Sequence, residues 1–241
     1  VHVTENTGAL MQKKNATGVF EFFAKVFAPL VPIFAGSGLL FGFKQIFVLI
    51  FNLTGSQFFN PAAVADGGSM FMAAFAVLCG TFFTYLNIAV AMSACKVMGG
   101  NPYLGLVAGG IVINLGGLAG ASMGFLGLTF TNGRGGTLSA LAAGALIAVV
   151  ERWIKKRTPD ALKVHLPSLG AIVVVGLLTM FVLQPVLGFV MDIITTALLW
   201  LFNTAGPIGG AVIAFAFLPL VMTGMHHGLI PVHTTLIQTL G

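Results

Sequence analysis

The sequence predicts an all-α, polytopic membrane protein, and three observations carry this prediction. Hydrophobic residues make up 57% of the 241 residues and charged residues only 7%, whereas a soluble domain carries roughly 25% charged residues. The mean hydropathy is +1.02. The 32 glycines and 22 phenylalanines suit closely packed transmembrane helices. This composition excludes a soluble globule, a disordered chain and a coiled coil.

Long apolar segments, most of them near the length of about 20 residues that crosses a bilayer, divide the chain into predicted spans. The last two segments are short, so the expected number of transmembrane helices is about six or seven. Lys44 lies inside the first segment, where its side chain is expected to snorkel to the membrane surface. The segments cover residues 26–51, 70–94, 102–120, 125–150, 168–190, 191–202 and 209–220.

Positively charged residues indicate which loops face the cytoplasm. Lys13, Lys96 and the charged cluster at residues 151–163 are expected on the cytoplasmic side, together with the N-terminus. Residues 52–68 contain no Lys or Arg and are expected outside. This distribution accounts for the net charge of +5, and without a basic patch interleaved with aromatic residues we expect no nucleic-acid partner.

The ends of the chain suggest an internal piece of a longer protein. Residues 1–18 are polar, do not begin with Met and lack the pattern of a signal peptide, so we expect a linker there. Cys79 and Cys95 are sixteen residues apart in one apolar segment. On a helix this spacing is about 24 Å, too far for a disulfide, and they are expected to be small apolar fillers.

Few residues could carry chemistry. The six Asp and Glu residues include no adjacent pair for acid–base catalysis. The sequence has no phosphate-binding loop, dinucleotide fingerprint or zinc motif. We therefore expect neither a metal nor a cofactor, and an ATP-driven pump is unsupported.

The histidines are more informative, because three of the five cluster in residues 223–233: His226, His227 and His233. An ionisable residue at membrane depth indicates function, and imidazole can both accept a hydroxyl proton and donate a hydrogen bond. The neighbouring glycines and Pro231 would break a regular helix, and the binding sites of transporters lie at such broken helices. The alternative is a loop at the start of a helix; we favour function for His226 and His227 and the loop role for His233.

Arg134 is the second candidate. It lies in the polar segment Thr-Asn-Gly-Arg-Gly-Gly at residues 131–136. Its guanidinium could bind a sugar hydroxyl or a phosphate, or it could only hold a tight turn. The sequence favours neither alternative.

Several motifs, taken in order, resemble one known family. They are Phe-Ala-Pro-Leu-Val-Pro-Ile-Phe-Ala-Gly-Ser-Gly-Leu-Leu at 27–40, Ala-Cys-Lys-Val-Met-Gly-Gly-Asn-Pro-Tyr-Leu-Gly at 94–105, Gly-Arg-Gly-Gly at 133–136 with Glu-Arg-Trp-Ile-Lys-Lys-Arg-Thr-Pro-Asp at 151–160, and Gly-Met-His-His-Gly-Leu-Ile-Pro at 224–231. Together they resemble enzyme IIC, the sugar permease domain of the bacterial phosphoenolpyruvate-dependent phosphotransferase system. The closest branch is the glucose superfamily, in its β-glucoside, sucrose, trehalose and N-acetylmuramate group.

The resemblance implies an elevator-type, homodimeric permease in the bacterial inner membrane.

 It implies that the domain binds a sugar (a glucoside, a disaccharide or an amino sugar), carries it across and presents it to the phosphocysteine of enzyme IIB, which enzyme IIA phosphorylates. The family's catalytic and substrate-binding histidine corresponds to His226, with His227 beside it, and Arg134 is the further substrate-binding candidate.

The resemblance also sets the expected domain boundaries. Residues 1–18 correspond to a linker from an upstream enzyme IIB domain, and residues 19–241 to the N-terminal part of enzyme IIC. The chain ends before the glutamate of the family's Gly-x-x-Glu-Pro type motif, so a half of the sugar site is expected downstream. The phosphocysteine domain of the sugar phosphotransferase is also absent from this sequence.

Two other functions were weighed against the permease. A proton-coupled secondary sugar transporter would use the histidines as a relay, but it would also need well-placed intramembrane Asp or Glu. A membrane scaffold without transport would leave the His-His motif unexplained. The sequence therefore favours the phosphotransferase permease.

Overall fold

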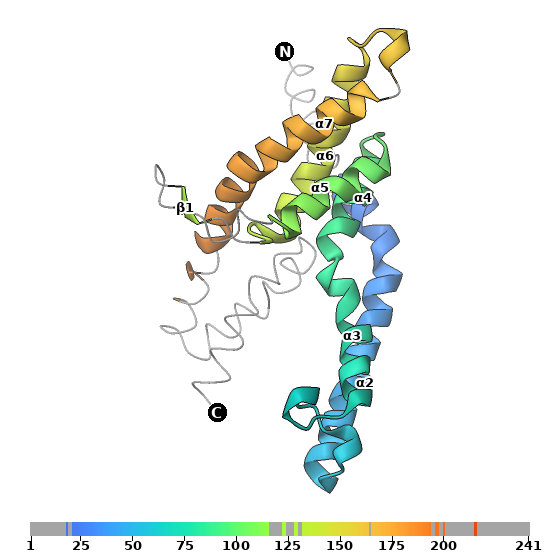
Figure 1. Cartoon of the computed structure of the whole chain (residues 1–241), viewed down its shortest axis with the longest axis vertical. Helices are drawn as coiled ribbons and strands as arrows, with labels where there is room; N and C mark the ends of the chain where they lie inside the picture. Colours follow the sequence, from blue (N-terminus) through green and yellow to red (C-terminus); the bar gives the residue numbers. More distant parts are fainter. Residues whose placement is uncertain are drawn as a thin grey trace, which may run out of the picture. The chain divides into compact units, whose positions relative to one another are not determined.

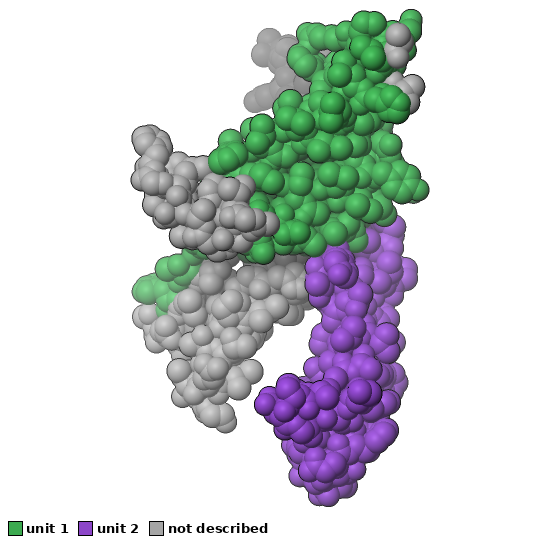
Figure 2. All heavy atoms as spheres, in the orientation of Figure 1, with its two compact units in different colours: residues 1–26, 87–241 green, residues 27–86 purple. Residues whose placement is uncertain are grey.

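The computed structural model describes residues 18, 21–115, 122–123, 128–129, 132–163, 165–193, 196–197, 200 and 215. In this part of the chain the regular structure is helical, apart from one antiparallel pair of two-residue strands, β1 (Ser122–Met123) and β2 (Leu128–Thr129). The chain divides into two compact units, residues 27–86 and residues 1–26 with 87–241 (Figure 2).

The prediction of an all-α, polytopic membrane protein is confirmed. Among the described residues, four helices are long and apolar enough to cross a bilayer: Glu21–Thr54, Met70–Val97, Gly136–Lys155 and Leu166–Ile193. Half of the predicted segment 191–202, and all of 209–220 except residue 215, lie outside the described residues. The count of six or seven spans therefore stays a prediction.

Residues 27–86 form a helical hairpin (Figure 1). Phe34 lies against Phe82, with ring centroids 5.0 Å apart, and Phe47 lies against Phe75 at 5.3 Å. Because the early residue of one helix meets the late residue of the other, the two helices are antiparallel. The elements are η1 (Ala28–Leu30), α2 (Val31–Thr54), η2 (Gln57–Phe59), η3 (Val64–Asp66) and α3 (Met70–Thr84).

Asn60 organises the connection between α2 and α3. Its amide nitrogen donates to Gln57 Oε1 at 3.0 Å and to the carbonyl of Gly67 at 3.3 Å. Its own carbonyl accepts from the amide of Ser69 at 3.1 Å, the residue that caps the N-terminus of α3. These bonds give the loop at residues 52–68 a defined structure, although the loop contains no Lys or Arg.

The other unit contains a bundle of closely packed helices. Glycines allow this packing, since a Cβ at Gly105 or Gly109 of α5 would lie 2.8 Å from Met92 Cα or 2.6 Å from Ile88 Cα of α4. Gly109 therefore packs inside the protomer, against α4. The elements are α4 (Leu86–Val97), α5 (Pro102–Ile113), α6 (Gly136–Lys155), η5 (Asp160–Leu162), α7 (Leu166–Leu178) and the π-helical turn η6 (Thr179–Leu183).

Two helix boundaries differ from the sequence prediction. Helix α5 ends at Ile113 after 12 residues, about 18 Å, which is shorter than the hydrocarbon core of about 30 Å. Helix α6 begins at Gly136 rather than at residue 125. The polar segment expected inside this span is instead a turn that leads into the helix, because Gly133 and Gly135 have left-handed backbone angles.

Helices α6 and α7 are antiparallel. At one end a Cβ at Gly170 would lie 2.9 Å from Ile154 Cδ1, and at the other a Cβ at Gly135 would lie 3.1 Å from Leu187 Cβ. The helical chain continues from Leu166 to Ile193, in agreement with the predicted segment 168–190. The polar turn before α6 is thereby placed beside residues 184–192.

Candidate functional site

The polar turn at residues 132–136 owes its shape to glycine. Gly133, Gly135 and Gly136 have φ angles of 73°, 79° and 54°. This left-handed region is strained for residues with a Cβ. Three left-handed glycines around one arginine fold the chain tightly enough to start α6 directly after Arg134.

The turn is fastened to the end of α5. The amide of Gly133 donates to the carbonyl of Val112 at 2.8 Å, and the amide of Leu115 donates to Asn132 Oδ1 at 3.0 Å. Gln184 Nε2 donates to the same Val112 carbonyl at 3.1 Å. The last carbonyls of a helix lack partners within it, so these bonds satisfy the C-terminus of α5 in a buried environment.

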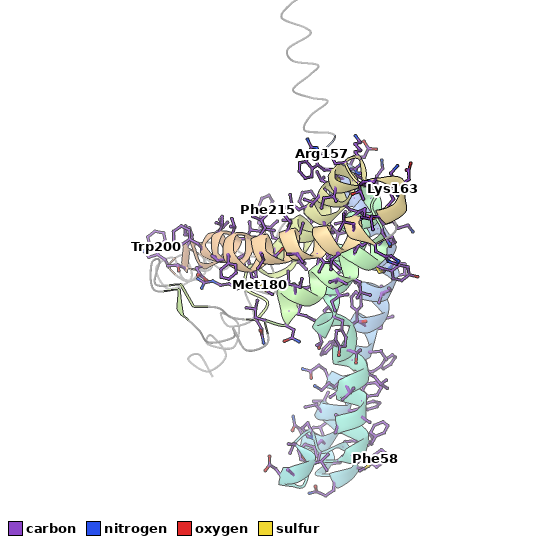
Figure 3. The ribbon with its side chains drawn as sticks, turned by 45° about the horizontal axis from the view of Figure 1, so that its top comes forward. Phe58, Arg157, Lys163, Met180, Trp200 and Phe215 are labelled. Carbon is purple, nitrogen blue, oxygen red and sulfur yellow. The ribbon has the colours of Figure 1, made fainter. Side chains whose placement is uncertain are left out.

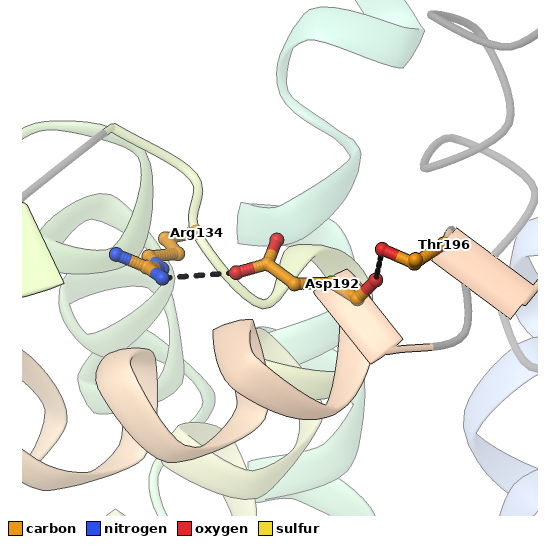
Figure 4. A network of polar contacts seen from close by, with 3 residues as sticks. All are labelled: Arg134, Asp192 and Thr196. Carbon is orange, nitrogen blue, oxygen red and sulfur yellow. Dashed lines mark hydrogen bonds and ion pairs between the residues drawn. The ribbon is translucent and has the colours of Figure 1, made fainter.

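Arg134 extends from this turn to the helix that follows α7 (Figure 4). Its Nη2 lies 3.0 Å from Asp192 Oδ2, and its side chain is 16% exposed against 65% for Asp192. Gly188 makes room for it, since a Cβ there would lie 2.5 Å from both Cγ and Nε of Arg134. Thr196 Oγ1 donates to the backbone carbonyl of Asp192 at 2.7 Å.

Sequence reasoning identified Arg134 but missed its ion-pair partner Asp192. It also missed Gly188, which makes room for the arginine, and Gln184, which bonds the end of α5. These three residues recur every four positions, which places them on one face of a helix. Two polar residues with a glycine between them, at helical spacing in an apolar segment, could have identified this face. Their partners could not be read from the sequence, because Arg134 and Asp192 are 58 residues apart.

Several buried polar atoms near these elements have no hydrogen-bond partner. They are Ser139 Oγ in the first turn of α6, Thr179 Oγ1 in η6 and Gln184 Oε1. All three side chains are at most 1% exposed. Unpartnered buried polar atoms are uncommon, and hydroxyl and amide groups can hydrogen-bond a polyhydroxyl ligand or water. The bundle therefore contains uncommitted polar groups on α6 and on the helix around Gln184.

A second polar junction joins two of the sequence motifs at the opposite end of α6. The backbone amide of Asn101 donates to Glu151 Oε2 at 3.1 Å, while its side chain caps α5 by accepting from the amide of Tyr103 at 3.1 Å. A Cβ at Gly100 would lie 2.8 Å from Ala148 Cα. The α4–α5 connection and the last turns of α6 therefore lie together.

The predicted histidines and cysteines differ in whether the structure describes them. His226 and His227, and also His233, lie outside the described residues, so their roles stay predictions. Cys79 and Cys95 are free and buried, in agreement with their expected role as apolar fillers. In the described part of the chain, no group of three His, Cys, Asp or Glu side chains could hold a metal ion.

The long apolar helices define a polytopic membrane protein. A family model described as "Phosphotransferase system, EIIC" matches residues 24–240. The chain belongs to this family, as its motifs predicted, and it is a multi-pass bacterial membrane protein.

Curated relatives are longer than this chain. A protein of Bacillus subtilis (strain 168) named "Putative PTS system EIIBC component YbbF" is 33% identical over 235 residues, which cover 96% of this chain and 48% of the relative. The "PTS system MurNAc-GlcNAc-specific EIIBC component" of Staphylococcus aureus (strain USA300) is 32% identical over 226 residues, covering 92% of this chain and 45% of the relative. The chain thus spans about half the length of these relatives. No solved structure matches it.

Proposed function

We propose that this chain is part of a sugar permease that binds a sugar and carries it across the membrane for phosphorylation during uptake. The observation that carries the proposal is the family match over residues 24–240, which includes the motif Gly-Met-His-His-Gly at 224–228. The relative named for MurNAc-GlcNAc favours an amino sugar within the expected range of glucosides, disaccharides and amino sugars.

In the proposed chemistry, His226 contacts the sugar hydroxyl that becomes phosphorylated. Phosphoryl transfer depends mainly on positioning and charge stabilisation, and an imidazole can orient the hydroxyl and accept its proton. His227 and Arg134 are the proposed further contacts to the sugar. The pairing of Arg134 with Asp192 supports a positioned guanidinium, whether it contacts the sugar directly or holds the turn that does.

The proposed phosphate donor is the phosphocysteine of an enzyme IIB domain, which enzyme IIA phosphorylates. The relatives named EIIBC support a partner of the IIB type, with residues 1–18 as its linker. The N-terminus is proposed to face the cytoplasm. The contact between Asn101 and Glu151 supports this orientation, because it brings Lys96 in the last turn of α4 and the basic end of α6 to one side.

The permease is further proposed to be a homodimer formed by its early helices. Helix α2 supports this: Ala35, Gly38 and Gly42 line an apolar hollow of about 620 Å³ together with Leu39, Phe43 and Ile46. Gly38 and Gly42 form the small-xxx-small spacing that lets two transmembrane helices approach closely. Among the described residues, a Cβ at either glycine would meet no atom within 4 Å, so this face of α2 has space for a second helix.

The source of energy tests the proposed function against a proton-coupled transporter. Membrane vesicles that contain the full-length protein should accumulate sugar phosphate when phosphoenolpyruvate and the soluble phosphotransferase proteins are supplied. A protonophore should leave this uptake unchanged. Accumulation of unmodified sugar that a protonophore abolishes would instead establish the proton-coupled function.

A further inference from the structure

The end of α6 forms a basic hollow on the surface of its unit. The hollow has a volume of about 380 Å³, and four cationic side chains line it: Arg152, Lys155, Lys156 and Lys163. Arg157 and Lys163 are labelled at this end of the unit in Figure 3. Three of the lining residues come from the last turns of α6 and its end, and Lys163 comes from the connection to α7.

The positive charge of this hollow is only partly compensated. Lys163 forms an ion pair with Asp160, and Glu151 accepts a hydrogen bond from the amide of Asn101. In the described part of the chain, none of Arg152, Lys155 and Lys156 forms an ion pair. A hollow of this composition attracts an anion, and arginine and lysine both bind phosphate oxygens well.

Aromatic and apolar surface adjoins the basic residues. Trp153 is 58% exposed and its ring lies 3.9 Å from the guanidinium carbon of Arg157. Exposed Val149 precedes it on α6, and exposed Leu166 and Leu169 begin α7. Tryptophan is enriched where a membrane meets water, and exposed apolar side chains on transmembrane helices face acyl chains. Basic, aromatic and apolar surface in this combination is typical of the level at which a helix meets lipid headgroups.

We propose that this hollow binds the phosphodiester headgroup of an anionic phospholipid, such as phosphatidylglycerol. Arg152, Lys155, Lys156 and Lys163 contact the phosphate, while the acyl chains lie along the exposed apolar side chains of α6 and α7. Basic pockets between transmembrane helices bind anionic headgroups in this way. A soluble phosphorylated protein could also bind these cations, but it would not need the exposed apolar side chains that adjoin them. The phospholipid is therefore favoured.

Native mass spectrometry of the full-length protein in detergent tests this proposal. Phosphatidylglycerol and phosphatidylcholine with the same acyl chains are titrated separately, and the lipid-bound fraction gives an apparent Kd. We expect phosphatidylglycerol to bind at least tenfold more tightly. Each cation near an anionic lipid contributes roughly a factor of five, so Lys155→Gln/Lys156→Gln should weaken phosphatidylglycerol binding about 30-fold.

Two matched variants separate charge from folding. Lys155→Arg/Lys156→Arg keeps the charge and should keep tight binding. Lys25→Gln/Lys96→Gln removes two exposed lysines that do not line the hollow and should leave binding unchanged. Circular dichroism checks that all variants retain their helices.

Three results would overturn the proposal. They are equal binding of the two lipids, an unchanged Kd in the glutamine double variant, and an equal loss of binding in the Lys25→Gln/Lys96→Gln control. Inorganic phosphate at millimolar concentration provides the remaining comparison. We expect it to leave the lipid bound, and complete displacement would identify a free-phosphate site instead of a lipid site.

Discussion

Arg134 Nη2 and Asp192 Oδ2 lie 3.0 Å apart and join the start of α6 to the far end of the helix that runs from Leu166 to Ile193. The guanidinium is mostly buried and the carboxylate is mostly exposed, so the pair lies at the edge of the packed helices. The glycine at 188, which leaves space for the guanidinium, shows that the helix surface is shaped to fit it. The pair therefore ties the polar turn to a specific register of this helix.

A double-mutant cycle measures this link. Arg134→Gln, Asp192→Asn and the double variant should show a coupling of about 0.5–1 kcal/mol in thermal unfolding in detergent, since Asp192 is largely exposed and solvent weakens the pair. Gly188→Ala should also lower the unfolding temperature, because the added Cβ would displace the Arg134 side chain. Strictly additive effects of the two charge-removing substitutions would show that the ion pair contributes nothing to stability.

Close helix packing gives a second prediction. A Cβ at Gly144 of α6 would lie 2.7 Å from Ala91 Cα, and backbone atoms cannot move aside as a flexible side chain can. Gly144→Ala should therefore lower the free energy of unfolding by about 1–3 kcal/mol. Gly110→Ala is the matched control: a Cβ there meets no atom within 4 Å, and alanine favours helix by up to about 1 kcal/mol. Equal effects on the unfolding temperature would contradict the packing of α4 against α6.

The sequence was sufficient to predict the long helices, because length and hydropathy alone determine whether a segment can span a bilayer. It failed at the end of α5 and the start of α6. The apolar stretch at 102–120 continues past the hydrogen-bonded helix, which ends where Gly133 and Gln184 take over the carbonyl of Val112. Such a boundary depends on contacts between distant segments, which hydropathy does not record.

The candidate site shows the same division. The glycines around Arg134 indicated a tight turn, and the structure gives all three the left-handed angles that such a turn needs. Asp192 has no second carboxylate beside it in the sequence, and nothing there indicates a partner. Its pairing with Arg134 depends on the antiparallel packing of α6 and α7, and this register is a property of the folded bundle.

The proposed topology can be tested by chemical labelling. Cys79 and Cys95, both buried, are first replaced by alanine, and single cysteines are then introduced as Gln57→Cys or Lys156→Cys. A membrane-impermeant maleimide should label position 57 from the outside of intact cells and position 156 only after the membrane is opened. Labelling of both positions from the same side would contradict the orientation.

The proposed dimer interface on α2 gives a further prediction. Gly38→Leu/Gly42→Leu should fill the hollow on this helix and prevent close approach of a second copy. Chemical cross-linking of the purified full-length protein should then shift from dimer to monomer, whereas Gly110→Leu on α5 should leave the dimer intact. A wild-type protein that cross-links only as a monomer would refute the dimer itself.

The proposed mechanism makes its most specific prediction at His226. If this imidazole orients the sugar hydroxyl and accepts its proton, His226→Ala in the full-length protein should reduce sugar phosphorylation by about 10²–10⁴-fold, with normal insertion into the membrane. His233→Ala should do much less, because Pro231 separates it from the His-His motif. Arg134→Ala should fall between them if the arginine contacts sugar, and should mainly lower the protein level if it only holds the turn.

The measurement is phosphoenolpyruvate-dependent sugar phosphorylation in membrane vesicles, normalised to the amount of protein. Near-normal phosphorylation by His226→Ala would show that the catalytic contact lies elsewhere in the permease.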